Sequence, residues 1–251
     1  MRRQVFGITL VSVVSLSVVM VDVHAAEIKV LSSVGFKSAV EHLAGRFTNL
    51  TGHTLDAEFG TSNALKYSIA TSMRFDVAIL TPSVWKELSE RGHLLKPVTN
   101  IARSGVGIAV RAGSPKPELA NGADLFGVLA RAKSIAYAQD GASGIYFLNL
   151  IERHGLSFHP SKLIGVIGTS PLSLVANGEA ELGIQLISEI KAADGVELGG
   201  SFPSDFQTYT VLAAGVSAET PILDAANDLI DFLRSAPARE KMRELGLEPV
   251  P

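Results

Sequence analysis

The regular alternation of short β-branched runs with longer segments of helical period is the feature that most constrains the fold of this chain. The runs at Ile28–Leu31, Thr54–Phe59 and Phe75–Leu80 have the buried or alternating apolar pattern of strands. The segments between them, Ser38–Asn49 and Asn63–Met73, repeat apolar residues every three or four positions, as amphipathic helices do. Repeated strand-helix-strand units favour a parallel sheet with helices on both faces, so the sequence predicts an α/β fold.

A second series of the same kind follows the strand expected at Val106–Val110. Its strands are predicted at Ser134–Tyr137 and Leu163–Ile167. Its helices are predicted at Ile145–His154 and Leu172–Asn177. Two successive series indicate two α/β lobes, each with its own sheet.

The chain is expected to return to the first lobe through the strand Gln207–Ala213, and the amphipathic segment Ala225–Leu245 then completes that lobe. We therefore predict two lobes with parallel-rich sheets, joined by two crossing strands. Residues 26–104 together with 209–251 are assigned to lobe 1, and residues 105–208 to lobe 2.

The N-terminus has the layout of a secretory signal peptide over residues 1–25. Arg2 and Arg3 supply positive charge, Val5–Val21 is almost entirely apolar, and short residues precede Ala26. An uncleaved membrane anchor is the alternative, since a spanning helix needs about 17–25 apolar residues. The chain has no cysteine, which excludes a lipid-anchor cysteine, disulfides and thiolate metal sites. We expect cleavage and a periplasmic location.

Charge and motif patterns exclude several classes of protein. A net charge of −3 without a basic stripe argues against a nucleic-acid partner. The six histidines form no HExxH pair. In Gly141–Gly144 a glycine directly follows the serine, unlike the GxSxG nucleophile elbow. We therefore expect no enzymatic activity and no cofactor or metal.

Small hydroxyl residues and glycines gather where predicted strands end and helices begin. They occur at Ser32–Gly35, Gly60–Asn63, Thr81–Ser83, Gly141–Gly144 and Gly168–Ser170. Ligands of open α/β sheets bind at these strand ends, and helix N-termini offer free N–H groups to an anion. Each loop taken singly also has a structural explanation, because Ser, Thr and Asn are the best helix N-caps. The candidate ligand-binding residues from these loops are Ser32, Ser33, Gly35, Thr61, Ser62, Asn63, Ser143, Gly144, Thr169 and Ser170.

Taken in order, five segments make the chain similar to the periplasmic molybdate-binding proteins and to the wider type II periplasmic binding proteins. These segments are Ile28–Val40, Phe59–Leu65, Phe75–Trp85, Gly144–Tyr146 and Leu174–Ile184. The resemblance implies a type II fold, a small anionic ligand held between the lobes, and the membrane permease of an ABC importer as partner. We expect a monomer that closes around its ligand by a hinge motion of the crossing strands.

In the molybdate-binding proteins, hydroxyls and backbone amides hold the oxyanion without a basic side chain. Ser62 and the turn at Ser143 match two of these positions. The sequence departs from the family at Gly35, where the family has a serine, at Gly168, where it has a valine, and at Leu186, where it has a ligand-contacting tyrosine. Leu186 is therefore added to the candidate ligand-binding residues.

These departures remove hydroxyls and enlarge the expected pocket, so two ligand classes stay open. One is a small oxyanion such as molybdate or tungstate, or another small anion. The other is an organic acid or phosphonate, with Leu186 and Tyr146 beside its apolar part and Lys37 or Lys66 as a countercharge. A sensor module and an enzyme on the same fold are less favoured.

Overall fold

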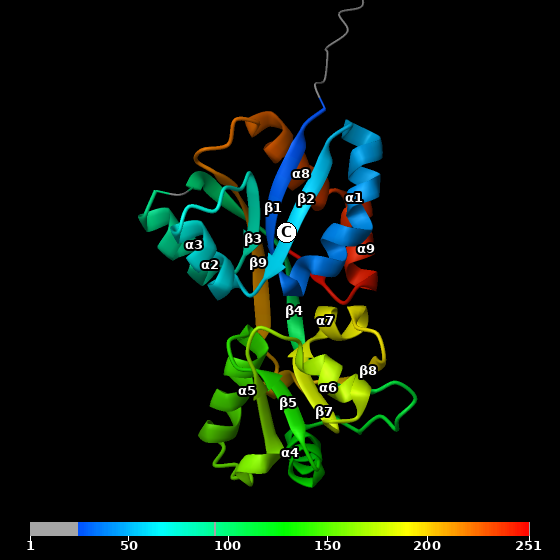
Figure 1. Ribbon diagram of the computed structural model, residues 1–251. Helices are drawn as coiled ribbons and strands as arrows, with labels where there is room; N and C mark the ends of the chain where they lie inside the picture. The colour runs from blue at the N-terminus through cyan, green and yellow to red at the C-terminus, as the bar shows by residue number, and fades with distance from the viewer. Residues whose placement is uncertain (1–24, 93, 251) are drawn as a thin grey trace, which may run out of the picture.

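The computed structural model describes residues 25–92 and 94–250, and these form two lobes stacked along one long axis (Figure 1). The predicted signal peptide, apart from its last residue, lies outside the described residues. Within the described part, no helix combines the length and the apolar character that crossing a membrane requires.

The first lobe is built on a sheet with the order β2-β1-β3-β9-β4. Strand β1 pairs in parallel with β2 and β3, whereas β9 runs antiparallel to β3. Helices α1, α8 and α9 cover one face and α2 and α3 the other (Figure 1). The elements of this lobe are β1 (Glu27–Ser33), the 3-10 turn η1 (Val34–Phe36), α1 (Lys37–Thr51), β2 (Thr54–Gly60), α2 (Ser62–Ala70), β3 (Val77–Leu80), α3 (Pro82–Glu90), β9 (Tyr209–Ser217), α8 (Leu223–Arg234), α9 (Ala236–Glu244) and β10 (Glu248–Pro249).

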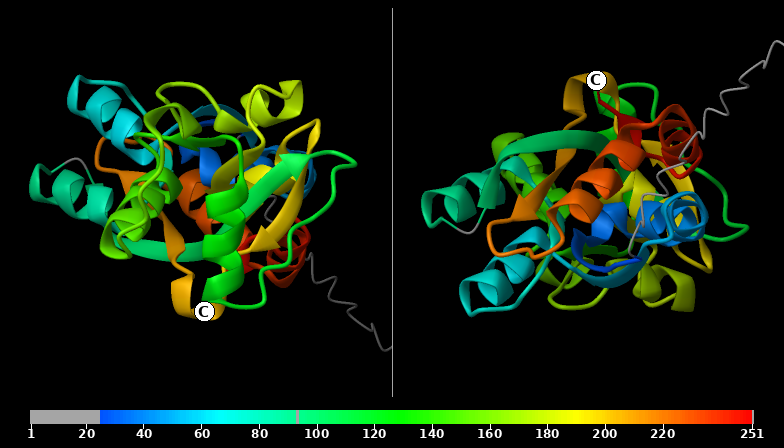
Figure 2. Two further views of the ribbon diagram at one scale, coloured as in Figure 1. Left: turned by 90° about the horizontal axis from the view of Figure 1, so that it is seen from below. Right: turned by 90° about the horizontal axis from the view of Figure 1, so that it is seen from above.

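The second lobe repeats this arrangement with the order β4-β7-β5-β6, and β8 also pairs with β4. Strand β5 pairs in parallel with β6 and β7. Helices α4 and α5 pack on one face, and α6 and α7 on the other; Figure 2 shows helices around the sheets in views along the long axis. The elements are β4 (Leu94–Arg111), α4 (Gly122–Arg131), β5 (Ile135–Ala138), α5 (Ala142–Arg153), η2 (Pro160–Lys162), β6 (Leu163–Val166), α6 (Pro171–Asn177), β7 (Leu182–Leu186), α7 (Ile187–Ala192), β8 (Val196–Ser201) and η3 (Ser204–Phe206).

Two strands carry the chain between the lobes, as the sequence predicted. The long strand β4 belongs to both sheets, and β9 pairs with it at the crossing, where Gly105 lies opposite Tyr209. The side chain of Gln207 forms two hydrogen bonds with the backbone of Val106 beside this crossing. Its Oε1 accepts a hydrogen bond from the Val106 N–H at 2.7 Å, and its Nε2 donates to the Val106 carbonyl at 3.0 Å. The predicted two-lobed α/β fold is therefore confirmed.

The hydrophobic cores of the lobes separate along β4. This strand contributes Ile101 and Ala102 to the core that contains β1, β3, β9 and the C-terminal helices. It contributes Val106 and Ile108 to the core that contains β5, β7, α4 and α5. Side chains on either side of the crossing therefore enter different cores, and the lobe boundaries at 104/105 and 208/209 stay a prediction.

Several elements of the fold were not predicted. The first half of β4, helix α4, helix α7 and strand β8 received no assignment. The glycines of β8 reflect close packing, since a Cβ on Gly200 would lie 2.7 Å from Leu119 Cδ1. The predicted segment Ala225–Leu245 divides into α8 and α9 at Ser235, where Pro237 occupies the first turn of α9.

The first turn of α5 lies against the end of β5, and this contact yields a stability prediction. A Cβ on Gly144 would stand 1.8 Å from the Ala138 carbonyl oxygen, which is backbone and cannot rotate away. We expect Gly144→Ala to lower the free energy of unfolding by about 3 kcal/mol, measured by urea denaturation.

Gly45→Ala is the matched control, because Gly45 lies within α1 with open space around its Cβ position. We expect that substitution to raise stability by up to about 1 kcal/mol, as the helix propensity of alanine predicts. Equal effects at the two glycines would contradict the packing described here.

Candidate functional site

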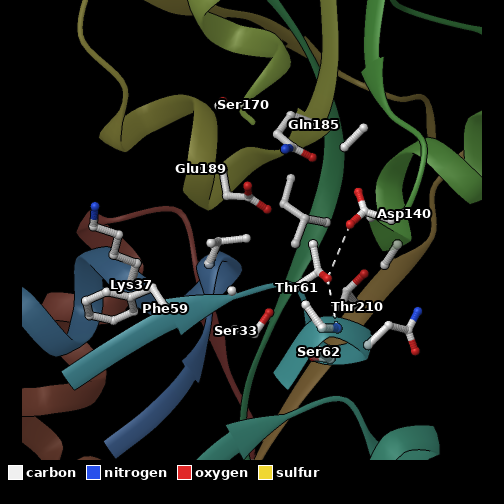
Figure 3. Close-up of a pocket in the computed structure, with 18 of the residues that line it drawn as sticks. Ser33, Lys37, Phe59, Thr61, Ser62, Asp140, Ser170, Gln185, Glu189 and Thr210 are labelled. Carbon is white, nitrogen blue, oxygen red and sulfur yellow. Dashed lines mark hydrogen bonds between the residues drawn. The ribbon is translucent and has the colours of Figure 1, made fainter. Parts of the chain in front are cut away.

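A cleft of about 680 Å³ opens between the lobes and is lined from both of them (Figure 3). Its walls come from the ends of β1, β2, β3, β5 and β7 and from the helices that follow these strands. This is the position where open α/β sheets bind ligands. The predicted residues that line the cleft are Ser33, Thr61, Ser62, Asn63, Thr169, Ser170 and Leu186.

Four predicted residues lie outside the lining. Ser32 is fully buried, and its hydroxyl donates to the Ser33 carbonyl. Gly35 is packed under Leu186, and its carbonyl accepts a hydrogen bond from Ser188. Helix α5 begins at Ala142 rather than at Ile145, which places Ser143 and Gly144 inside its first turn instead of in the loop before it.

The buried hydroxyl of Ser143 does not face the cleft but holds a residue that does. It donates a hydrogen bond to Oε1 of Gln185, a residue of β7 that does line the cleft. Gly144 packs against β5, as described above. The predicted segment therefore borders the cleft, but the side chain of Ser143 and the Cα of Gly144 form part of the scaffold.

The wall from lobe 1 presents hydroxyl groups at the starts of helices. The hydroxyl of Ser33, at the end of β1, has no hydrogen-bond partner among the described residues and faces the cleft (Figure 3). Thr61 caps α2, accepting from the Ala64 N–H at 3.2 Å. Ser62 Oγ accepts from the Thr81 N–H at 3.2 Å, so this hydroxyl also joins α2 to the end of β3.

The wall from lobe 2 brings a second set of polar groups toward the first. Thr61 Oγ1 donates to the Asp140 carboxyl across the cleft at 3.5 Å, a long hydrogen bond that links the two lobes (Figure 3). Ser170 caps α6 by accepting from the Leu172 N–H at 3.3 Å. Polar contacts between the lobes at the mouth of the cleft are what a hinge-closing protein needs to hold its closed form.

The two lysines considered as countercharges are engaged elsewhere. Lys37 pairs with Glu41 at 3.7 Å and lies over the Phe59 ring, directed away from the centre of the cleft (Figure 3). Lys66 pairs with Glu87 at 2.8 Å. The ammonium groups of both lysines are therefore paired with glutamates.

The expectation that Tyr146 would line the pocket is wrong. Its hydroxyl donates to the Phe206 carbonyl at 2.6 Å, and its ring packs against the core of lobe 2. Burial raises the pKa of this phenol above its ordinary value. Tyr146 therefore stabilises the lobe and does not contact the cleft.

Glu189 is one of several residues of the cleft that the sequence analysis missed, together with Asp140, Gln185 and Thr210. It lies on α7, and Figure 3 shows its carboxyl directed into the cleft. No described residue donates a hydrogen bond to this carboxyl or forms an ion pair with it. Burial without a partner disfavours the charged form and raises the pKa of Glu189 from 4.5 to about 8.

Helix α7 is held to lobe 1 as well as to its own lobe. The Ser188 N–H donates to Ser104 Oγ at 3.1 Å, and the Ser188 hydroxyl donates to the Gly35 carbonyl at 2.8 Å. Ser104 in turn donates to the Gly246 carbonyl at 3.3 Å. These bonds lie beside the crossing strands. They therefore hold Glu189, the next residue of α7, at a fixed position relative to the hinge.

No group of three or more histidine, aspartate or glutamate side chains within residues 25–92 and 94–250 could hold a metal ion. The polar groups that line the cleft are hydroxyls, backbone and side-chain amides, the Lys37 ammonium and the carboxyls of Glu41, Asp140 and Glu189.

The titration of Glu189 predicts how stability depends on pH. Its pKa in the folded protein lies above the ordinary value of 4.5, so its contribution is full below pH 4.5 and is lost as the pH rises to about 8. We expect the unfolding free energy of the ligand-free protein to fall across this range, by at most about 1.4 kcal/mol per pH unit from this group. Urea denaturation at several pH values measures the effect.

Glu189→Gln should remove this component, whereas Glu152→Gln, at an exposed position of α5, should retain it. Comparing the two variants separates Glu189 from other titrating groups. Identical pH dependence in both would mean that the Glu189 carboxyl titrates near its ordinary value.

Solved structures of similar fold include a molybdate-binding protein and a protein solved with bound L-phospholactate. A periplasmic molybdate-binding protein from Azotobacter vinelandii superposes with a TM-score of 0.75 at 21% identity, over 89% of this chain and 99% of that chain. PEB3, a Campylobacter jejuni protein, superposes in its L-phospholactate-bound form with a TM-score of 0.65 at 15% identity, over 88% of this chain and 99% of that chain. At these identities the likeness establishes the fold.

Sequence comparison adds a closer relative. A Pseudomonas protein named aconitate isomerase is 30% identical over 230 residues, which cover 88% of this chain and 87% of that protein. The model of the family described as bacterial extracellular solute-binding protein matches residues 28–248, nearly all of both lobes. With its two lobes, its crossing strands and its polar cleft, the chain belongs to the bacterial extracellular solute-binding protein family.

Proposed function

We propose that this protein captures a small organic polycarboxylate between its lobes. The observation that carries the proposal is the mixed lining of the cleft, where apolar side chains alternate with hydroxyls. Phe59, Ile145, Leu172 and Leu186 line the same cavity as the serines and threonines described above. A bare oxyanion needs only hydrogen-bond donors, whereas an organic acid also has a carbon skeleton to place against apolar groups.

The size of the cleft supports the same class of ligand. Its volume of about 680 Å³ lies within the range of roughly 300–1,000 Å³ that pockets for organic ligands occupy. Leu186 is part of this effect, because it presents methyl groups where a tyrosine would present a hydroxyl. Molybdate or tungstate remains the alternative, and the binding experiment below distinguishes the two.

The names of two similar proteins favour organic acids. Aconitate is a six-carbon unsaturated tricarboxylate, and the Pseudomonas relative is named for acting on it. PEB3 was solved with L-phospholactate, which carries a carboxylate and a phosphate on a short carbon chain. Both ligands present several acidic groups on a small skeleton, which fits hydroxyls and helix N-termini arriving from two lobes.

The family also supports a location and a partner. An extracellular solute-binding protein works outside the cytoplasm and delivers its ligand to the permease of an ABC importer. Closure about β4 and β9 would bury the ligand and shorten the contact between Thr61 and Asp140, presenting a closed form to the permease.

Isomerisation of the bound acid is a second candidate function, and it reverses the expectation of no catalytic activity. The relative named aconitate isomerase favours it, together with an unpaired carboxyl at Glu189 inside the cleft. Binding and isomerisation need the same cleft, so the two candidates share the same ligand class and are separated by measuring turnover.

The binding proposal is tested by thermal shift and calorimetry on ligand-stripped protein. We expect trans-aconitate, cis-aconitate or citrate to raise the melting temperature, because a ligand at one hundred times its dissociation constant adds about 2.7 kcal/mol of stability. Phospholactate, molybdate, tungstate and sulfate complete the panel. A shift with molybdate or tungstate alone would overturn the proposal in favour of an inorganic oxyanion.

The free hydroxyl of Ser33 provides the matching mutation. A hydrogen bond to a charged group contributes about 1.5–3 kcal/mol, so we expect Ser33→Ala to weaken carboxylate binding roughly 10-fold to 100-fold. Ser173→Ala is the control, because the exposed Ser173 hydroxyl donates to the Ser170 carbonyl and lies outside the cleft lining. Unchanged affinity in Ser33→Ala would place the ligand away from the end of β1.

A further inference from the structure

We propose that Glu189 is a catalytic residue that transfers a proton between two carbons of an unsaturated polycarboxylate bound in the cleft. The inference rests on the proposed function, since it requires the organic acid to occupy this cleft. It goes further by assigning an acid-base reaction and the residue that performs it. The argument starts from the surroundings of the carboxyl.

The Glu189 carboxyl lies in an apolar part of the cleft wall. An ideal Cβ on Gly35 would stand 3.8 Å from Glu189 Oε1 and 2.8 Å from Leu186 Cδ1, so the three residues adjoin one another. Val34 and Ala193 line the cleft nearby. The carboxyl therefore faces the ligand space beside apolar groups, and no described residue donates a hydrogen bond to it.

Several charged groups on the elements packed against α7 are paired with one another, and the two other charged or titratable side chains of α1, His42 and Arg46, are exposed. Helix α7 contacts α1, η1, β4, β7 and β8, and neither η1 nor β7 carries a charged residue. At the start of α1, Lys37 pairs with Glu41 at 3.7 Å. On β8, Glu197 pairs with Lys116 at 3.0 Å. None of these pairs supplies a cation to the Glu189 carboxyl.

The remaining charges are also directed elsewhere. Lys191, on α7 itself, donates to the Glu244 carbonyl at 3.1 Å. On β4, Arg103 pairs with Glu248 at 2.8 Å, and Arg111 is the last residue of the strand, beyond the crossing at Gly105. Across the cleft, the Asp140 carboxyl accepts from Thr61.

This environment makes the ionised carboxyl a stronger base than an ordinary glutamate. A pKa of about 8 lies near neutral pH, where a general base combines sufficient basicity with a usable ionised fraction. A carboxyl whose only role was to bind an anion would be unfavourable at this position, because two like charges repel. Proton transfer gives the group a role that fits its location.

The reaction is a 1,3-proton shift within the ligand. Ionised Glu189 removes a proton from the saturated carbon next to the double bond, and the electron pair of that C–H bond forms the new double bond. The former π pair then takes a proton from Glu189 at the third carbon, forming a C–H bond there and regenerating the carboxylate. Atoms and charges balance without an oxidant, reductant or second substrate.

The structure also provides rigid placement for the base. The two hydrogen bonds of Ser188 fix α7 to Gly35 and Ser104 beside the crossing strands. Glu189 therefore keeps its position relative to the hinge while hydroxyls from both lobes bind the carboxylates of the ligand. Donors that fix the ligand and a base that is fixed beside it favour proton transfer between the first and third carbons of the allylic unit.

The test follows trans-aconitate in D2O by proton NMR in the presence of the purified protein. We expect loss of the methylene signal and appearance of the cis isomer, both catalysed. Glu189→Gln should lower both rates at least about 100-fold while dissociation constants measured by calorimetry stay within a few-fold. Glu152→Gln, an exposed carboxyl of α5, should react like the unaltered protein.

A pH series gives a readout that a purely structural role would not move. The rate of deuterium exchange into the bound acid should rise with pH and level off near pH 8. Glu189→Asp should retain part of this rate, with its pH profile shifted. Binding without exchange in the unaltered protein would overturn this inference and leave the proposed function intact. Exchange that persists in Glu189→Gln would assign the base elsewhere, whereas absence of binding would overturn the proposed function itself.

Discussion

The antiparallel pairing of β4 with β9 is the constraint on which the rest of the structure depends. Strand β4 continues from this pairing into the sheet of the second lobe, where it pairs with β7 and β8, and the Gln207 side chain adds two hydrogen bonds to Val106 beside the crossing. Because the sheets share β4, the carboxyl ends of their parallel strands face one cleft. The hydroxyl groups, the helix starts and the Glu189 carboxyl converge as a consequence of that pairing.

The cleft combines two electrostatic features that have opposite effects on an anion. Hydroxyls and helix N-termini attract negative charge, and Lys37 and Lys66 are paired away from the centre. The Glu189 carboxyl would repel an anion if it were ionised, and its burial reduces this repulsion by holding its pKa near 8. A site of this kind can bind a polycarboxylate at neutral pH and still contain a base. The same geometry is therefore compatible with capture and with proton transfer.

Membership of a solute-binding family does not by itself decide between these activities. Both need a two-lobed scaffold, a closing motion and recognition of the ligand from two sides. What distinguishes them is one side chain with suitable basicity at a fixed position. Glu189 meets this requirement because Ser188, the preceding residue, ties α7 to the hinge. Because Glu189 lies near the hinge, its position changes little when the cleft opens or closes.

The sequence by itself determined the fold and much of the cleft, because strand and helix periodicity and the small residues at strand ends are local signals. The crossing strands were predicted, as were Ser33, Thr61, Ser62, Asn63, Thr169, Ser170 and Leu186 as residues of the expected site, all of which line the cleft. Only the tertiary structure decided that Ser143 and Gly144 belong to a helix turn, that Tyr146 is turned into the core, and that Glu189 faces the ligand space. These outcomes depend on which elements meet across the hinge, and contacts between residues distant in the chain leave no local pattern.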